Sequence, residues 1–174
     1  MRIRLDKIGS EPFEWREEVS IAPKKLESAE VIGLSPIDWR GRIWTEHPGF
    51  QLEATLGYEQ TVTCDRCLAP TVERVDTQVH WIVLQNAPQL TAEEVELSAE
   101  DLEITYVDGD ELDADELLLE QLRLNVPMRS VCSDDCRGLC PRCGINRNLE
   151  TCDCDQVAVD PRWEVLRDLE KPQS

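Results

Sequence analysis

Cysteines constrain this chain more than any other residue type, because five of its eight fall within nineteen residues. The stretch CRGLCPRCGINRNLETCDC runs from Cys136 to Cys154. Four thiolates that approach from tight turns enclose one metal ion in a closed tetrahedral site. Eight cysteines therefore allow two such sites, in a chain of 174 residues that has room for one ordinary core and a small appendage.

The redox compartment decides between metal ligands and disulfides. No stretch approaches the roughly 20 apolar residues that span a bilayer, and the amino-terminal MRIRLDKIGSEPFEW lacks the apolar centre of a signal peptide. We therefore expect a cytoplasmic protein that makes no membrane contact. In a reducing compartment, close pairs such as Cys-x-x-Cys favour metal binding, and a secreted disulfide framework is the alternative.

The spacing of the cysteines predicts how they group. CPRCG has the form of a zinc knuckle, and CDC follows it as another close pair, so one predicted zinc site consists of Cys140, Cys143, Cys152 and Cys154. The CDRC and CSDDC pairs predict the other site, which consists of Cys64, Cys67, Cys132 and Cys136. An ion shared by this second group would join segments about seventy residues apart and clamp the C-terminal region onto the body.

Three alternatives to this grouping stay open at the level of sequence. Cys136 can exchange places with a member of the other site, because spacing alone does not fix the pairing. All-thiolate ligation also admits an iron–sulfur cluster, although sites of the knuckle type more often hold zinc. Finally, Cys64 and Cys67 can be two buried free thiols.

Residues 1–90 alternate apolar and polar side chains in the manner of β-strands. Two segments show this most clearly, with one face formed by Phe50, Leu52, Ala54 and Leu56 and another by Val75, Thr77, Val79, Trp81 and Val83. Gly57 offers a turn after the first of them. RIRLDKI also alternates, SAEVIGLSP is a candidate short strand, and IAPKKLESAE is a candidate helical turn.

Helices are expected after this β-rich part. DADELLLEQLRLNVP predicts a helix that Asp113 or Asp115 caps and Pro127 ends, with an apolar stripe formed by Leu117, Leu118, Leu122 and Leu124. DPRWEVLRDLE predicts a short helix from Asp160, with Trp163, Leu166 and Leu169 facing inward.

The predicted fold class is α+β, with an antiparallel β-sheet or partly closed barrel in the N-terminal half. The predicted divisions are a β-rich body at 1–90, an acidic segment and a helix packing on the body at 91–130, and a Cys-rich zinc-binding region with a short C-terminal helix at 131–174.

The charge is strongly acidic, at -18, and this excludes a protein that coats duplex nucleic acid. Thr91 to Glu120 carries thirteen acidic residues and no Lys or Arg, which indicates either a solvated surface or a site for a basic partner. In contrast, Arg137, Arg142 and Arg147 occur on the Cys-rich loop with no acidic residue between them. Their guanidinium groups can meet RNA phosphates or acidic protein, or can simply offset thiolate charge.

Catalysis is not expected. A catalytic zinc keeps an open position, whereas four thiolates fill the coordination sphere. The sequence also has neither a GxxxxGK nor a GxGxxG phosphate-binding loop. We therefore predict no catalytic residues, no small-molecule substrate and zinc as the cofactor.

Several of these motifs, taken in order, resemble the YceD family of bacterial and plastid proteins, named for 23S ribosomal RNA accumulation. They are TCDRCLAP, the acidic segment, a helix ending in Pro, CSDDCRGLCPRCGINRNLETCDC and DPRWEVLRDL. The chain departs from the family at GINRN, where Arg147 replaces an apolar residue and so affects the packing of this loop.

The resemblance implies a non-enzymatic role in the synthesis, processing or stability of 23S ribosomal RNA and in assembly of the large ribosomal subunit. We expect a basic ribosomal or RNA-processing protein to bind the acidic segment, with local contact between the Arg-bearing loop and 23S ribosomal RNA. The cytoplasm is the expected location, or the plastid stroma if the source has plastids. The alternative function is a zinc-ribbon-type interaction adaptor associated with transcription.

Overall fold

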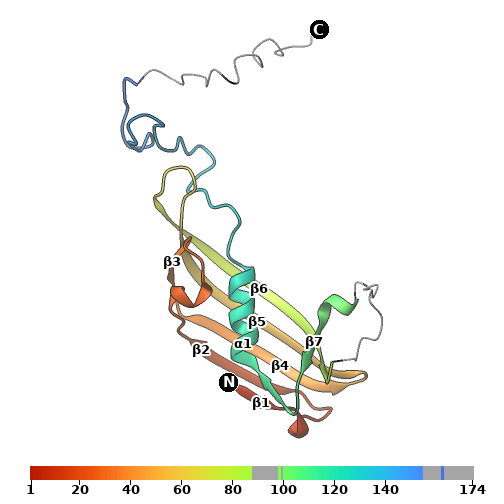
Figure 1. Cartoon of the computed structure of the whole chain (residues 1–174). Helices are drawn as coiled ribbons and strands as arrows, with labels where there is room; N and C mark the ends of the chain where they lie inside the picture. The colour runs from red at the N-terminus through yellow and green to blue at the C-terminus, as the bar shows by residue number, and fades with distance from the viewer. Residues whose placement is uncertain (88–97, 99, 155–161, 163–174) are drawn as a thin grey trace, which may run out of the picture.

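Two long strands form the centre of the fold. The computed structural model describes residues 1–87, 98, 100–154 and 162. In it, β5 (Gly49–Thr63) and β6 (Pro70–Gln85) form an antiparallel hairpin. The other strands of this six-stranded sheet are β2 (Phe13–Val19), β3 (Val31–Leu34), β4 (Ile37–Glu46) and β7 (Ile104–Val107). The strand order is β2-β4-β5-β6-β7, and β3 also pairs with β5 (Figure 1).

This sheet is open and mixed, which refines the predicted antiparallel sheet or partly closed barrel. β7 pairs with β6 in parallel, and the other pairings within the sheet are antiparallel. The strands β2 and β7 lie at opposite ends of the strand order. The predicted α+β class agrees with this sheet and the helix that covers it.

The turn expected at Gly57 is wrong, because β5 continues through that residue to Thr63. Gly57 pairs with Asp38 of β4 on one side and with Asp76 of β6 on the other. Two neighbouring strands therefore hold the backbone of Gly57 extended, and this long-range pairing overrides the turn preference of glycine.

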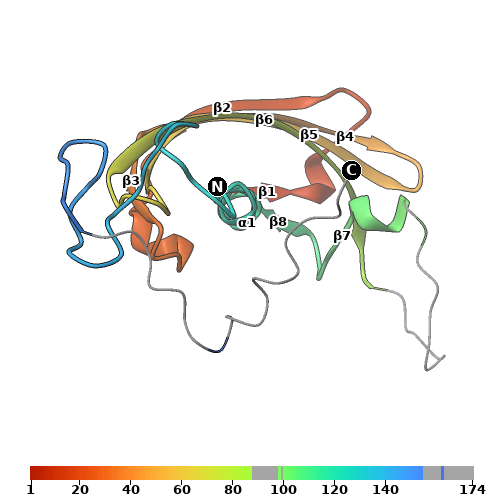
Figure 2. The same cartoon turned by 90° about the horizontal axis from the view of Figure 1, so that it is seen from above.

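Among the described residues, one long helix covers the concave face of the sheet. Figure 2 shows the sheet arching over α1 (Ala114–Leu124), with β1 (Arg2–Arg4) and β8 (Glu111–Asp113) on the same side. Period-two alternation points the apolar residues of β4, β5 and β6 toward this helix. The core they share includes Trp39, Ile43, Leu52, Leu56, Val62, Val83, Leu118 and Leu122, all fully buried.

The predicted cap of α1 is confirmed for Asp113, whose Oδ1 accepts from the backbone N–H of Asp115 at 3.0 Å and of Glu116 at 3.3 Å. The predicted apolar stripe is correct except for Leu124, which is 70 % exposed. Leu124 lies about 200° around the helix from buried Leu122, so it faces away from the sheet.

Short elements complete the described structure. RIRLDKI forms a strand only over β1 and then turns into the 3-10 helix η1 (Leu5–Lys7), while β1 pairs with β8 in a separate two-stranded sheet. The expected short strand and helical turn are present as β3 and the 3-10 helix η2 (Pro23–Leu26), and a further 3-10 helix, η3 (Glu100–Glu103), precedes β7. Within the described ranges, no helix is both long and apolar enough to span a membrane.

Parts of the sequence-based prediction fall outside the described residues. These are residues 91–97 and 99 of the acidic segment and the predicted helix from Asp160, apart from Arg162. The proposed division at residues 90 and 130 stays a prediction.

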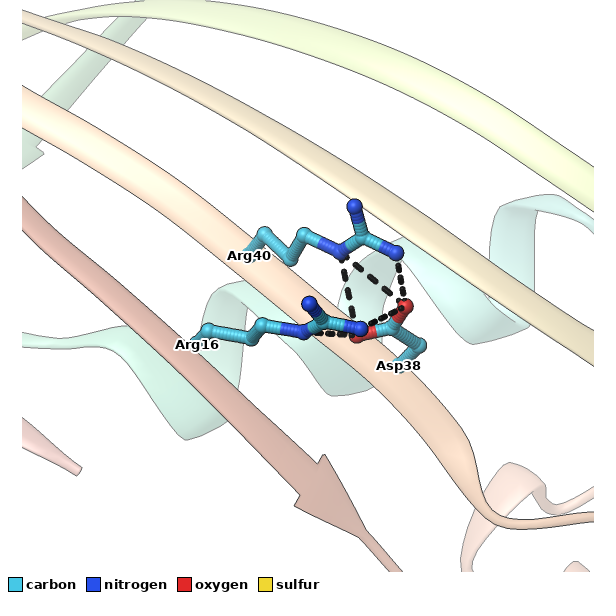
Figure 3. Close-up of polar contacts among 3 residues, drawn as sticks. All are labelled: Arg16, Asp38 and Arg40. Carbon is cyan, nitrogen blue, oxygen red and sulfur yellow. Dashed lines mark hydrogen bonds and ion pairs between the residues drawn. The ribbon is translucent and has the colours of Figure 1, made fainter.

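The outer face of the sheet is polar. Arg16 of β2 lies directly opposite Arg40 of β4, and both guanidinium groups donate to the Asp38 carboxylate (Figure 3). The hydrogen bond from Arg40 and the charge of Arg16 lower the pKa of Asp38. Since like charges directly opposite on neighbouring strands repel, the shared carboxylate is what makes this arginine pair compatible with the sheet.

Candidate metal centres

The eight cysteines form two groups of four, and the sulfur atoms within each group lie within 4.8 Å of one another. We call the group at the end of the sheet the clamp centre; it consists of Cys64, Cys67, Cys132 and Cys136. The other group is the loop centre, which consists of Cys140, Cys143, Cys152 and Cys154. These groups agree with the predicted grouping, and Cys136 lies with the clamp centre rather than in the exchanged arrangement.

The distances between sulfur atoms fit one metal ion. Zn–S bonds of about 2.3 Å place the sulfurs of a regular tetrahedron about 3.8 Å apart. In the clamp centre, the Sγ atoms of Cys64 and Cys136 are 3.9 Å apart, and those of Cys67 and Cys132 are 3.6 Å apart. These separations are too long for disulfide bonds and match the edges of such a tetrahedron. None of the eight cysteines is in a disulfide bond.

Each centre is built on a knuckle with the same backbone geometry. In the turn between β5 and β6, the N–H of Leu68 donates to the carbonyl of Cys64 at 2.9 Å. In the Cys-rich loop, the N–H of Gly144 donates to the carbonyl of Cys140, also at 2.9 Å. Leu68 and Gly144 occupy the equivalent left-handed position, with φ of 59° and 75°. The sequences CDRCL and CPRCG therefore make two versions of one turn.

Backbone amides point at the first sulfur of each knuckle. Burial opposes ionisation of Cys64, but N–H groups of Cys132, Cys67 and Arg66 lower its pKa to about 6. The N–H groups of Cys143 and Arg142 likewise lower the pKa of Cys140 to about 6. In each centre these amides therefore favour the thiolate of the first cysteine, which is the form that binds metal.

Two thiols in each centre resist ionisation, because neighbouring sulfur atoms raise the pKa of Cys67 and Cys132 in the clamp centre and of Cys152 and Cys154 in the loop centre. The hydrogen bond with Cys136 raises the pKa of Cys132 to about 12. The hydrogen bond with Cys143 has the same effect on Cys154, whose pKa is also raised to about 12. Only a cation in the centre would offset the charge of four thiolates, so binding of a metal ion there would release protons.

The clamp centre joins the sheet to the segment after α1. The N–H of Asp65 donates to the Ser130 carbonyl at 2.9 Å, and the N–H of Ser130 donates to the Asp65 carboxylate at 2.8 Å. The Ser130 hydroxyl also donates to Glu73 of β6 at 2.8 Å. In Figure 1, the turn between β5 and β6 and the Cys-rich loop lie at the same end of the sheet.

Arg66 makes a second set of contacts across this junction. Its guanidinium donates to the carbonyls of Asp134 and Cys136, at 3.2 and 3.1 Å. Its own carbonyl accepts from the N–H of Leu139 at 2.9 Å. A Cβ on Gly138 would lie 2.9 Å from that carbonyl oxygen, so the close approach requires glycine at this position.

Sequence reasoning missed Arg66, Ser130 and Asn148, whose contacts depend on segments that meet only in the fold. Asn148 donates through Nδ2 to the Sγ of Cys136 at 3.3 Å and accepts through Oδ1 from the N–H of Arg137 at 2.7 Å. The sequence signal for Asn148 was the pair of asparagines in GINRN, because Asn side chains bond to nearby backbone in turns.

The three arginines predicted to contact RNA lie around the loop centre. Arg137 and Arg142 are exposed and Arg147 is half-buried. Their backbone N–H groups serve the fold, since that of Arg142 points at the Cys140 sulfur and that of Arg147 donates to the Gly138 carbonyl at 2.9 Å. Contact between their side chains and RNA stays a prediction.

Comparison with known proteins places this arrangement in a family. Residues 52–170 match the family model described as large ribosomal RNA subunit accumulation protein YceD, a range that includes all eight cysteines. Uncharacterised proteins of Mycobacterium bovis and Mycobacterium tuberculosis are each 28 % identical over 178 residues, covering 100 % of this chain and 83 % of theirs.

A plant protein gives a shorter match. The chain is 29 % identical over 59 residues to the Arabidopsis thaliana protein named large ribosomal RNA subunit accumulation protein YCED homolog 1, chloroplastic, which covers 34 % of this chain and 18 % of that protein. No solved structure matches the chain.

Proposed function

Because the chain belongs to the YceD family of large ribosomal RNA subunit accumulation proteins, we propose that it acts as a non-enzymatic factor for 23S ribosomal RNA. The proposed role is in the synthesis, processing or stability of that RNA, and so in assembly of the large ribosomal subunit. The observation that carries the proposal is the family match over residues 52–170, which spans the sheet hairpin, α1 and both metal centres.

We propose that both centres hold zinc. Four sulfurs at tetrahedral spacing suit this ion, which has no redox chemistry and binds thiolates strongly. Zinc in such a site supplies a crosslink and leaves no position for a reacting water. The role of the clamp centre is then to fix the Cys-rich loop to the end of the sheet, which supports a scaffold rather than an enzyme.

The proposed partners follow from charge. Arg137 and Arg142 are exposed on the Cys-rich loop, so they are available to RNA phosphate. A net charge of -18 suits a basic ribosomal or RNA-processing protein at the acidic segment. The proposed location is the cytoplasm, where ribosomes assemble.

The test is the ratio of 23S to 16S ribosomal RNA, in mature and precursor forms, in cells depleted of the protein. We expect a selective 23S deficit that the wild-type chain restores and Cys140→Ser does not. The variant Leu149→Ala, at an exposed side chain of the same loop, serves as the matched control and should restore the ratio.

An unchanged ratio in depleted cells would refute the proposed role. Co-purification of RNA polymerase in that case would favour the transcription adaptor instead.

A further inference from the structure

Asn148 connects the two metal centres. Its Nδ2 donates to the Sγ of Cys136, a member of the clamp centre, at 3.3 Å. In the chain it lies between Cys143 and Cys152, which are members of the loop centre. A side chain from the segment between two loop-centre cysteines therefore contacts a sulfur of the clamp centre directly.

The orientation of the Asn148 amide follows from its partners. The backbone N–H of Arg137 can only donate, so the atom 2.7 Å from it is the carbonyl oxygen Oδ1. This leaves the Nδ2 group facing the Cys136 sulfur and the Oδ1 of Asn146, which is 2.9 Å away. A thiolate accepts hydrogen bonds, so the amide supports the charged, metal-binding form of Cys136.

The loop centre places Asn148 through a short chain of backbone bonds. The N–H of Cys140 donates to the Ile145 carbonyl at 2.8 Å, and the N–H of Arg147 donates to the Gly138 carbonyl at 2.9 Å. Leu139 and Asn146 form an antiparallel bridge between these two bonds. A metal ion that fixes Cys140 and Cys143 therefore also fixes the loop that presents Asn148 to Cys136.

From this geometry, we propose that Asn148 is a positioning residue that couples metal binding at the two centres. Loading of the loop centre orders Asn148, whose amide then strengthens metal binding at the clamp centre. Binding free energies are reciprocal, so loading of the clamp centre strengthens binding at the loop centre by the same factor. This inference rests on the proposed metal binding of both centres.

The test is a Co²⁺ titration of the full-length protein against a competing chelator, followed by visible absorption. Cys154→His gives the loop centre three sulfurs and one nitrogen, so that its Co²⁺ bands separate from those of the clamp centre. In this background we would compare Asn148→Leu and Asn148→Asp with the control Leu149→Ala, whose side chain is exposed.

We expect Asn148→Leu to weaken Co²⁺ binding at the clamp centre about 10-fold, the usual effect of losing a partner of a metal ligand. Asn148→Asp keeps the acceptor for the Arg137 N–H but turns a carboxylate oxygen toward the Cys136 thiolate. It should therefore weaken Co²⁺ binding at the clamp centre more than Asn148→Leu does. A purely structural role predicts a smaller loss for Asp than for Leu, because Asp keeps the bond from the Arg137 N–H while both variants lose the bond to the Asn146 Oδ1.

A second comparison tests the coupling itself. When Cys152→Ser and Cys154→Ser disable the loop centre, Asn148→Leu should change clamp-centre affinity by less than about 2-fold, because Asn148 is then no longer held in place. An equal effect in both backgrounds, or tolerance of Asn148→Asp, would overturn the coupling while leaving the metal centres in place. A wild-type chain that binds neither Co²⁺ nor Zn²⁺ would refute both the coupling and the proposed metal centres.

Discussion

Tyr58 buries a hydroxyl group in the core, which lowers the free energy of unfolding by an amount that can be measured. The residue is 4 % exposed, and among the described residues its hydroxyl has no hydrogen-bond partner. Burial raises the pKa of Tyr58 to about 12, because the phenolate is disfavoured there. An unpartnered buried hydroxyl lowers stability relative to a plain ring.

We expect Tyr58→Phe to leave the free energy of unfolding at pH 7 unchanged or to raise it by up to about 1 kcal/mol. The pH dependence has a defined sign. The folded pKa of Tyr58 lies above the unfolded value of about 10. The wild type therefore keeps its full stability below pH 10 and loses stability relative to Tyr58→Phe as pH rises toward 12. Urea denaturation of both proteins from pH 7 to 12 tests this, and parallel curves for the two above pH 10 would contradict it.

At the scale of the element, the two knuckles differ at the residue in the left-handed position. Leu68 has φ of 59° and a side chain that is 62 % exposed, whereas the loop centre has Gly144 there. A side chain in this conformation costs about 1–2 kcal/mol, and an exposed leucine recovers little of it through burial.

Leu68→Gly should therefore stabilise the turn between β5 and β6 by about 0.5–1 kcal/mol, after allowing for the extra flexibility of glycine in the unfolded chain. The reciprocal control, Gly144→Ala, should destabilise its own knuckle by a similar amount. Urea denaturation at a fixed free zinc concentration, with metal release as the signal, measures both. A loss of stability in Leu68→Gly would show that the leucine side chain makes a contact that stabilises the turn by more than the backbone strain destabilises it.

Local sequence patterns predicted the strands and the helix. The features that they did not predict depend on pairing between distant parts of the chain. The alternation of β5 and β6 and the Asp113 cap depend on neighbours in sequence, so they could be identified from residues alone. The passage of β5 through Gly57 and the parallel pairing of β7 depend on strands far away in the chain. Likewise, each Cys-x-x-Cys pair was evident, but Arg66 and Ser130 became part of the site only through the fold.

At the scale of the whole molecule, the described residues form two separate hydrophobic cores that differ greatly in size. The main core lies between the sheet and α1 and contains large apolar side chains such as Trp39 and Leu118. The small core consists of Cys64, Cys67 and Cys136, with Ala69, Val131 and Leu139 packed against it. So few apolar groups do not offset the conformational entropy of the loop, and we therefore expect the proposed metal ions to order it.

Removing metal with a chelator should therefore unfold the Cys-rich loop and leave the sheet folded. Hydrogen exchange provides the measurement, because the N–H of Leu139 bonds the loop to the Arg66 carbonyl, that of Arg147 bonds to Gly138 within the loop, and those of β5 bond within the sheet. We expect the loop amides to lose protection in the chelated protein, and β5 amides near Leu52 to keep theirs. Added zinc should restore the protection of the loop amides. Loss of protection throughout β5 would show that the main core depends on the metal centres, and unchanged protection of Leu139 would show that protein contacts alone hold the loop on the sheet.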